Sequence, residues 1–375
     1  MIDYIEIRAA ATREIIGIID TAKSIIWHVL YYDTGDFEIY APCNNFTVNL
    51  LVAGNYVSRP NEKHVGIIEN VEYIFNTFDG RMIVATGRMC KSILDRRIIY
   101  RLSGYSVSPT ILSGNVETAA RTVVNDNAIS CSFDSARNMS VLVLGTHSGS
   151  TKTIVDSGGN PTTKQVTYNN LMLWTNEFLR EYEIGSYIGI DDNLKLSYCC
   201  FEGVDRSIDN IGGNDPVIFS QQFDNLLSSD YVYGEEKYKN MALVGGEGEG
   251  TTRFCSVLIP TQTGFERREK FIDASSSSKK YKDEHGDEQT LTDAEYNAQL
   301  QAIAAQDLAG TQITQKFDGE INLNNGVYKY KTNFDLGDIV TIQDNEIGLY
   351  TNTRILEIIE TQDDNGYNIS AKYGV

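Results

Sequence analysis

Four histidines, His28, His64, His147 and His285, are the side chains best suited to ligate a metal or to act as a general base at neutral pH. They lie far apart in the sequence, and no His-Glu-x-x-His motif or regular His-Cys spacing connects them. The run Gly-Thr-His-Ser-Gly at 145–149 resembles a nucleophile elbow, but its serine is not central and no strand-to-helix turn follows. The sequence therefore predicts no catalytic residue and no metal site, unless the fold alone brings distant groups together.

A glycine-rich run at residues 245–250 (Gly-Gly-Glu-Gly-Glu-Gly) is the motif that most resembles a nucleotide-binding loop. A phosphate-binding loop needs a following lysine or a helix N-terminus, because these offset the charge of the phosphates. Here two glutamates lie inside the run, and Thr251, Thr252 and Arg253 lead into an expected strand. We expect a flexible turn or a close backbone contact, and no bound cofactor.

The acidic run at residues 283–288 (Asp-Glu-His-Gly-Asp-Glu) contains oxygen ligands that calcium prefers. It lacks the spacing of a true calcium loop, so a solvated run of charges is the better interpretation. No pair of carboxylates is marked by its sequence context as an acid and base for glycoside cleavage.

Two pairs of adjacent arginines, Arg96-Arg97 and Arg267-Arg268, stand out in an acidic sequence. Arginine forms bidentate ion pairs across protein interfaces, so these four residues are our candidates for an intersubunit interface. The alternative is that each arginine pairs with a carboxylate of its own chain, and the sequence leaves both open.

The overall composition describes a soluble globular protein of 375 residues with a net charge of −19. This charge argues against nucleic-acid binding and against docking on anionic membranes, since both depend on Lys and Arg. The sequence contains 22 Tyr but only 2 Trp, a bias that favours β-structure with extensive contact surfaces. No stretch is long and apolar enough to span a membrane, no secretory signal is visible, and the six cysteines are expected to be free thiols.

The elements expected along the chain follow the order β, mixed α+β, and β. Strands are expected up to about residue 95, including residues 46–50 and a hairpin that turns at Asp79-Gly80, and they suggest a small barrel or sandwich. Apolar stripes predict helices over 116–124, with Asn115 as N-cap, and over 170–182. Further strands follow from residue 187, with a hairpin at Asp192-Asn193. A capping box predicts a helix over 292–308, and strands resume over 326–373.

Several segments, taken in order, resemble the siphophage tail hub proteins, which are also called tail-associated or baseplate hub proteins. Their order and spacing carry the resemblance, since single motifs such as Leu336-Gly337-Asp338 are common turns. The matching segments are residues 82–88, 94–99, 114–117, 124–129, 203–207, 217–220, 223–226, 238–240, 244–248, 264–269, 271–274 and 334–340. The first 80 or so residues match less clearly, and serines replace the arginine that the family usually has after residue 274.

The resemblance implies a β-rich α+β multidomain fold, in which two small β-barrel tube-like domains flank a mixed α+β centre. The corresponding segments are 1–100 (first tube domain), 101–186 (intervening α+β domain), 187–274 and 326–375 (second tube domain), and 275–325 (helical insertion).

The resemblance also implies a structural protein that closes the distal end of a phage tail tube as a homotrimer. Its expected partners are the tail tube protein, the distal tail protein, the tape measure protein and a tail fibre or spike. Genomic DNA would pass through the ring without specific binding, and an acidic channel would repel it. Such a protein is assembled in the bacterial host cytoplasm and ends in the tail tip of the virion. The alternatives are a tail-associated cell-wall-degrading enzyme and a carbohydrate-binding host-recognition module.

Overall fold

The computed structural model describes residues 2, 4–156, 159–258, 263–282, 288–321, 327–346 and 348–374. It is a β-rich α+β structure and contains two compact units. Unit 1 consists of Met1–Ile154, Thr163–Asp230 and Phe317–Val375, and unit 2 consists of Val155–Thr162 and Tyr231–Lys316. Each unit is described here by itself.

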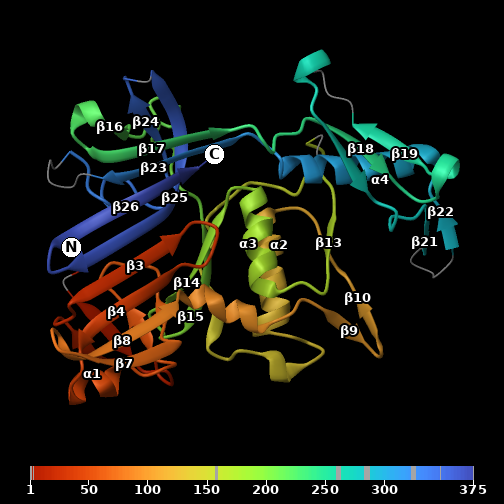
Figure 1. The fold of residues 1–375 in the computed structure, drawn as a ribbon. Helices are drawn as coiled ribbons and strands as arrows, with labels where there is room; N and C mark the ends of the chain where they lie inside the picture. The colour runs from red at the N-terminus through yellow and green to blue at the C-terminus, as the bar shows by residue number, and fades with distance from the viewer. Residues whose placement is uncertain are drawn as a thin grey trace. The chain divides into compact units, whose positions relative to one another are not determined.

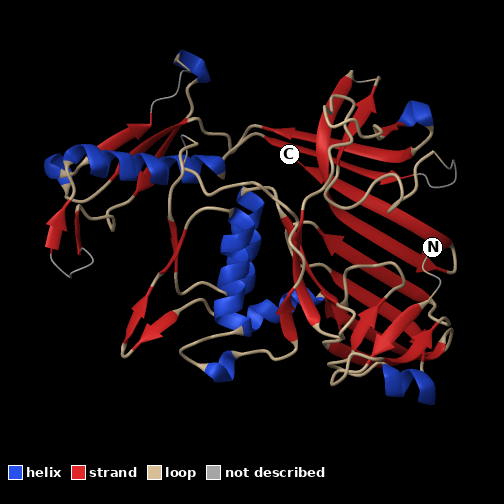
Figure 2. Cartoon of the chain, turned by 180° about the vertical axis from the view of Figure 1, so that it is seen from behind, coloured by secondary structure: helices blue, strands red, loops and turns tan. Residues whose placement is uncertain are grey.

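A large sheet with the strand order β17-β23-β26-β25-β3-β4-β8-β7 is the main feature of unit 1, and β24 and β16 extend it from β25 (Figures 1 and 2). Its strands are β3 (Ser24–Leu30), β4 (Asp36–Pro42), β7 (Asn70–Asn76), β8 (Gly80–Arg88), β16 (Ile218–Ser220), β17 (Leu226–Gly234), β23 (Thr314–Ile321), β24 (Ile339–Asp344), β25 (Leu349–Asp363) and β26 (Gly366–Gly374). The antiparallel ladder of β3 and β25, from Leu30↔Glu357 to Ile25↔Gln362, joins the two ends of the chain. The described strands do not close into a barrel.

One face of this sheet is apolar because large side chains alternate with polar ones along its strands. Trp27 on β3 and Phe37 and Ile39 on β4 are buried on that face. A second sheet, with the order β2-β1-β5-β6, lies against it. A Cβ at Gly66 in β6 would overlap the ring of Phe37, so the two backbones approach closely. The strands of the second sheet are β1 (Ile5–Arg8), β2 (Ile15–Ile19), β5 (Tyr56–Ser58) and β6 (Gly66–Ile67).

The segment 46–50, which we expected to be a strand, is helix α1 (Asn45–Leu50). The Asn44 side chain accepts hydrogen bonds from the backbone N–H groups of Phe46 and Thr47, and Thr47 Oγ1 accepts one from Asn44 N at 3.1 Å. This capping box satisfies the free donors of the first turn and outweighs the strand propensity of Phe, Thr and Val. The hairpin at Asp79-Gly80 is confirmed, because β7 and β8 pair up to Asn76↔Gly80.

The mixed centre of unit 1 contains α2 (Val116–Val124) and α3 (Leu171–Glu181), which begin after the N-caps Asn115 and Asn170. Both helices are confirmed, as is the hairpin of β14 (Gly185–Ile190) and β15 (Leu196–Phe201). A short π-helical turn (Asn125–Ile129) follows α2. The remaining short strands and turns are β9 (Arg101–Ser103), β10 (Ser106–Ser108), β11 (Thr110–Leu112), β12 (Leu142–Leu144), β13 (Lys164–Val166), η1 (Cys90–Arg96), η3 (Ser135–Arg137) and η4 (Gln221–Phe223).

Unit 2 is a three-stranded sheet covered on one face by helix α4 (Asp293–Ala309). The sheet order is β19-β18-β20, and Ala242 and Val244 of β18 pack against Tyr296 and Leu300 of α4. The expected capping box of Thr292 and Glu295 is present at the start of α4. The other elements of this unit are β18 (Met241–Gly245), β19 (Cys255–Leu258), β20 (Glu269–Asp273), β21 (Lys280–Lys282), β22 (Glu288–Thr290), η5 (Gly250–Thr252) and η6 (Gly264–Glu266).

Candidate functional site

The three described histidines, His28, His64 and His147, lie beside carboxylates and not beside one another. His28 Nδ1 lies 3.2 Å from Asp36, and His64 Nδ1 lies 2.9 Å from Glu62. His285 falls outside the described residues. Among the residues that the structure describes, no cluster of three or more His, Cys, Asp or Glu side chains could hold a metal ion.

The elbow-like run at 145–149 folds over the start of α2. Ser148 Oγ donates a 2.6 Å hydrogen bond to the buried carboxylate of Glu117, and His147 Nδ1 lies 3.4 Å from the same carboxylate. The serine is therefore bound to an acid and not to a histidine, so these contacts do not activate it as a nucleophile.

The glycine-rich run packs closely against helix α4 of unit 2. A Cβ at Gly246 would overlap the Tyr296 hydroxyl, which accepts a 2.8 Å hydrogen bond from Glu247 N. The carboxylate of Glu247 also accepts a hydrogen bond from Lys279 N at 3.0 Å. Close backbone packing thus accounts for the glycine at position 246. Of the acidic run, residues 283–287 lie outside the described residues, and Glu288 pairs with Lys280.

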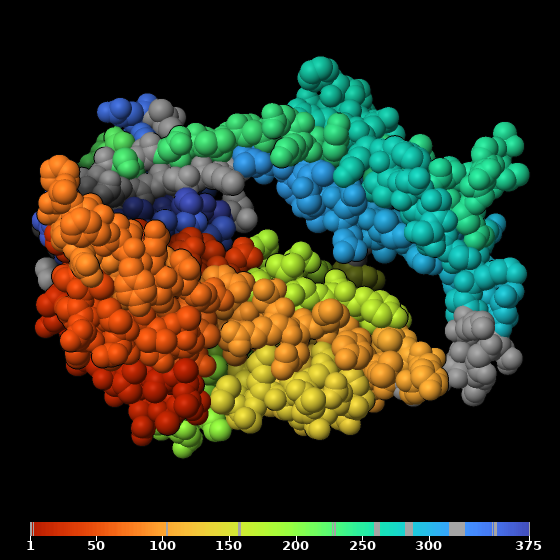
Figure 3. Space-filling view, turned by 60° about the horizontal axis from the view of Figure 1, so that its bottom comes forward, coloured from red at the N-terminus to blue at the C-terminus, as the bar shows by residue number. Residues whose placement is uncertain are grey.

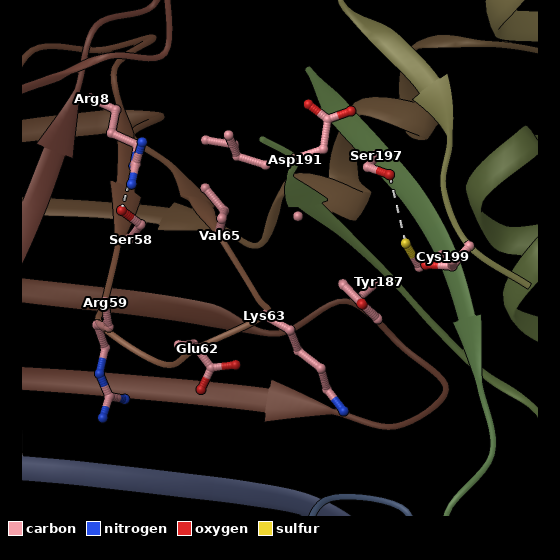
Figure 4. Close-up of a pocket in the computed structure, with 13 residues that line it drawn as sticks. Arg8, Ser58, Arg59, Glu62, Lys63, Val65, Tyr187, Asp191, Ser197 and Cys199 are labelled. Carbon is pink, nitrogen blue, oxygen red and sulfur yellow. Dashed lines mark hydrogen bonds between the residues drawn. The ribbon is translucent and has the colours of Figure 1, made fainter. Parts of the chain in front are cut away.

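A polar cavity of about 290 Å³ lies in unit 1 (Figure 4). It lies between the segment 58–65, which follows β5, and the β14–β15 hairpin. The cavity is lined by Arg8, Ser58, Arg59, Glu62, Lys63, Val65, Thr146, Tyr187, Gly189, Ile190, Asp191, Ser197 and Cys199.

Two of the charged side chains around this cavity, Arg59 and Glu62, are neutralised within the chain. Arg59 makes a bidentate pair with Glu360 of β25, at 2.7 and 3.0 Å, and both side chains are buried. Glu62 pairs with His64 and Lys331. Burial alone would raise the pKa of Glu62, but the hydrogen bond from His64 and the charge of Lys331 hold that pKa well below its usual range. We therefore interpret this network as a structural connection between the segment 59–64 and the C-terminal strands.

A second internal junction surrounds Tyr31, whose side chain is completely buried. Its ring lies against Gly185 and Gly337, where any Cβ would overlap it, and its hydroxyl accepts a 3.3 Å hydrogen bond from Gly203 N. The phenol group donates in turn toward the carbonyl of Glu183, at 3.2 Å. Burial raises the pKa of Tyr31, so this hydroxyl keeps its proton at neutral pH.

Two of the segments that carried the family resemblance, 203–207 and 334–340, meet beside this junction. Asp338 accepts hydrogen bonds from Val204 N at 2.7 Å and from Arg206 Nε at 3.0 Å. The backbones also pair, since Ile339 N donates to Val204 O at 3.0 Å. No local sequence pattern predicts this contact, because its partners are far apart in the chain. The motif Leu336-Gly337-Asp338 thus helps to connect the segment 334–340 with the segment 203–207.

The four candidate interface arginines have different surroundings. In unit 2, Arg267 pairs with Glu269 at 2.6 Å and Arg268 pairs with Glu235, as the local alternative expected. In unit 1, Arg96 is exposed and Arg97 donates only to backbone carbonyls, those of Arg137 and Arg96. Neither Arg96 nor Arg97 forms an ion pair with a described residue. The role of all four arginines in an interface stays a prediction.

Three solved structures share this fold over nearly the whole chain. They are the 43 kDa tail protein of prophage MuSo2 from Shewanella oneidensis (10% identity, TM-score 0.57, 99% and 98% of the two chains), a tail protein from Neisseria meningitidis MC58 (12%, 0.56, 99% and 96%), and the prophage tail protein gp18 from Listeria monocytogenes EGD-e (9%, 0.51, 98% and 94%). The fold is therefore that of phage and prophage tail proteins.

The chain belongs to the Siphovirus ReqiPepy6 Gp37-like protein family, whose model matches residues 4–375. No curated protein matches it. None of the described helices combines the length and the apolar character needed to cross a membrane.

Proposed function

We propose that this protein is a non-enzymatic structural component of a phage tail, namely the hub that closes the distal end of the tail tube. The family and the shared fold support a tail protein. The observation that carries the proposal further is the β3–β25 ladder, which fuses an N-terminal and a C-terminal group of strands into one sheet. Strands from the N-terminal and the C-terminal part of the chain thus share one continuous sheet. Such a sheet is suited to a mechanical role.

In this proposal the two groups of strands act as the two tube-like domains. The first is β3, β4, β8 and β7, within residues 1–100, and the second contains β24, β25 and β26 with β16. The parallel pairing of β16 with β24 supports a second domain built from both 187–274 and 326–375. Residues 101–186 and 275–325 are the intervening domains. Three copies would present six such groups to a hexameric tube and a threefold axis to a fibre or spike.

The face of the large sheet opposite the apolar one is the proposed wall of the channel. It carries Asp36 and Glu38 on β4, Glu72 on β7 and Glu357 on β25, all partly or fully exposed. These carboxylates would repel the phosphates of passing DNA and prevent adhesion. The tape measure protein would occupy the same channel before infection, and the tail tube and distal tail proteins would contact the outside of the ring.

Light scattering over a range of concentrations tests the assembly. A mass near three times 41.9 kDa, with rings in electron micrographs and stacking on purified tube protein, is the expected result. Hydrolysis of purified cell wall by the chain would instead support the enzymatic alternative, and binding of cell-wall glycans by a monomer would support the recognition module.

A further inference from the structure

The surface around Arg96 and Arg97 forms a cationic pocket of about 290 Å³ in unit 1. Its lining consists of Arg96, Arg97, Ile98, Tyr100, Asp134, Ala136 and Arg137. Three arginines therefore face one carboxylate, in a chain that carries an excess of 19 negative charges. That carboxylate is partly engaged, because Asp134 Oδ1 accepts a 3.1 Å hydrogen bond from Ala136 N and caps the turn η3.

Arg137 is the buried part of this pocket, and only 8% of its surface is exposed. Its guanidinium carbon lies 4.1 Å from the centre of the Tyr100 ring and 5.3 Å from that of Phe133, and one of its nitrogens donates to the carbonyl of Ile98. The other terminal nitrogen, Nη1, is buried and has no hydrogen-bond partner among the described residues. A buried guanidinium without an anion is costly, so this site is short of one negative charge.

Backbone hydrogen bonds hold the segment 97–99 of the pocket against the start of α3. Arg97 O accepts a hydrogen bond from Leu171 N at 2.9 Å, and Ile99 N donates to Asn169 O at 2.8 Å. The segment 97–99 is thereby fixed to the start of α3, which positions the arginines before any ligand arrives. Binding to such a preorganised site needs little reordering.

The surroundings of the pocket have the composition of a protein–protein interface. Ile98 is 55% exposed, and the adjoining hairpin β9–β10 carries exposed Leu102 and a fully exposed Tyr105 at its tip. Figure 1 shows this hairpin projecting away from α2 and α3, and in Figure 3 its residues fall within the orange surface, which earlier residues share. Exposed Tyr, Arg and Ile side chains around one pocket are typical of interface centres.

We propose that this pocket binds a carboxylate side chain of a second copy of this chain. The proposal rests on the ring described above, in which identical subunits must meet through two different surfaces. The chain supplies the complementary charge itself, because it has 51 Asp and Glu against 32 Lys and Arg. An exposed apolar centre favours a protein ligand over the phosphates of DNA.

The test is the concentration dependence of the mass of Arg96→Glu, measured by light scattering beside the wild type. The Arg96 side chain forms no hydrogen bond or ion pair with a described residue, so the variant is expected to fold, and circular dichroism checks this point. We expect the trimer to dissociate at a concentration at least tenfold higher in this variant. Lys280→Glu, which makes the same change of charge in an exposed pair of unit 2, is the matched control and should retain the wild-type mass.

A wild type and an Arg96→Glu, Arg97→Glu double variant that are equally trimeric would overturn the pocket but leave the ring intact. A wild type that stays monomeric at every concentration would overturn both. Binding of a labelled DNA duplex by the wild type that the double variant loses would assign the pocket to phosphate and contradict the proposal.

Discussion

Tyr31 and Gly337 are in direct contact at the centre of unit 1, and the contact leaves no room for a side chain at position 337. Gly337 also has a φ of +94°, a conformation that L-residues rarely adopt. The ring of Tyr31, the residue directly after β3, thus requires a glycine in the turn that precedes β24.

Gly337→Ala is expected to lower the free energy of unfolding by about 3 kcal/mol or more, because backbone strain and steric overlap add. Gly366→Ala is the matched control: its φ is +119°, but nothing lies within 4 Å of the added Cβ. We expect the control to lose only about 1–2 kcal/mol. Urea unfolding of both variants measures the difference. Equal decreases in the free energy of unfolding would show that the contact with Tyr31 does not contribute to the cost of the substitution.

The buried pair of Arg59 and Glu360 gives a second prediction. Glu360→Gln removes the anion from a buried guanidinium and should destabilise the protein by about 3–5 kcal/mol. Replacing both residues by Met should cost clearly less, because no uncompensated charge is left. Glu181→Gln, which disrupts the exposed pair with Lys164, should change stability by less than about 1 kcal/mol. Thermal unfolding of the three variants ranks them, and a double variant as unstable as Glu360→Gln would contradict the argument.

Lys91 gives a prediction about pH. It is fully buried, and its ammonium group donates to Tyr32 O at 2.7 Å without an ion pair to a described carboxylate. Burial lowers the pKa of Lys91 from 10.5 to about 7. Between these two values the unfolded chain binds the proton and the folded chain does not, so this lysine makes stability rise with pH in that window.

We expect the free energy of unfolding to rise by about 2 kcal/mol between pH 7 and pH 9 because of Lys91. Below pH 6 the contribution of Lys91 should not change with pH. Lys91→Met should flatten the dependence. Guanidinium unfolding at pH 6, 7, 8 and 9 for both proteins isolates the effect of this lysine from that of other groups. Parallel curves for wild type and variant would mean that Lys91 stays charged in the folded state.

Unit 2 provides a prediction of its own at the glycine-rich run. Gly246→Ala should disrupt the packing of the loop on α4, because the new methyl group meets the Tyr296 hydroxyl. Gly246→Ala should therefore lower the free energy of unfolding. Adding Tyr296→Phe should recover part of this loss of stability, even though it removes the hydrogen bond from Glu247 N. A double-mutant cycle in urea measures the coupling, and strict additivity would mean that the two residues act independently.

Local signals in the sequence were sufficient for the elements whose ends are fixed by neighbouring residues. Asn115 and Thr292 are side chains that cap the helix that follows, so their effect is readable from a few residues. The error at α1 is of the same kind, because a capping pair, Asn44 and Thr47, lay hidden in a stretch with strand propensity.

Contacts between distant segments could not be predicted from the sequence. The ladder of β3 and β25, and the hydrogen bonds that Asp338 accepts from Val204 N and Arg206 Nε, depend on the tertiary fold and leave no periodic pattern. Arg96 and Arg97 were singled out by their types, but Arg137, which completes their pocket, is an ordinary arginine in the sequence. Its contribution to the pocket follows only from the structure, where its guanidinium is buried against the Tyr100 ring and its Nη1 has no hydrogen-bond partner among the described residues.

The ladder between β3 and β25 also has a consequence for biosynthesis. Strand β3 leaves the ribosome early, but its pairing partner β25 is among the last strands to be made, so one edge of β3 stays unpaired while most of the chain is synthesised. Such long-range pairing is slow and leaves strand edges open to aggregation in the meantime. A premature stop before residue 349 would therefore release a product with an open β3 edge.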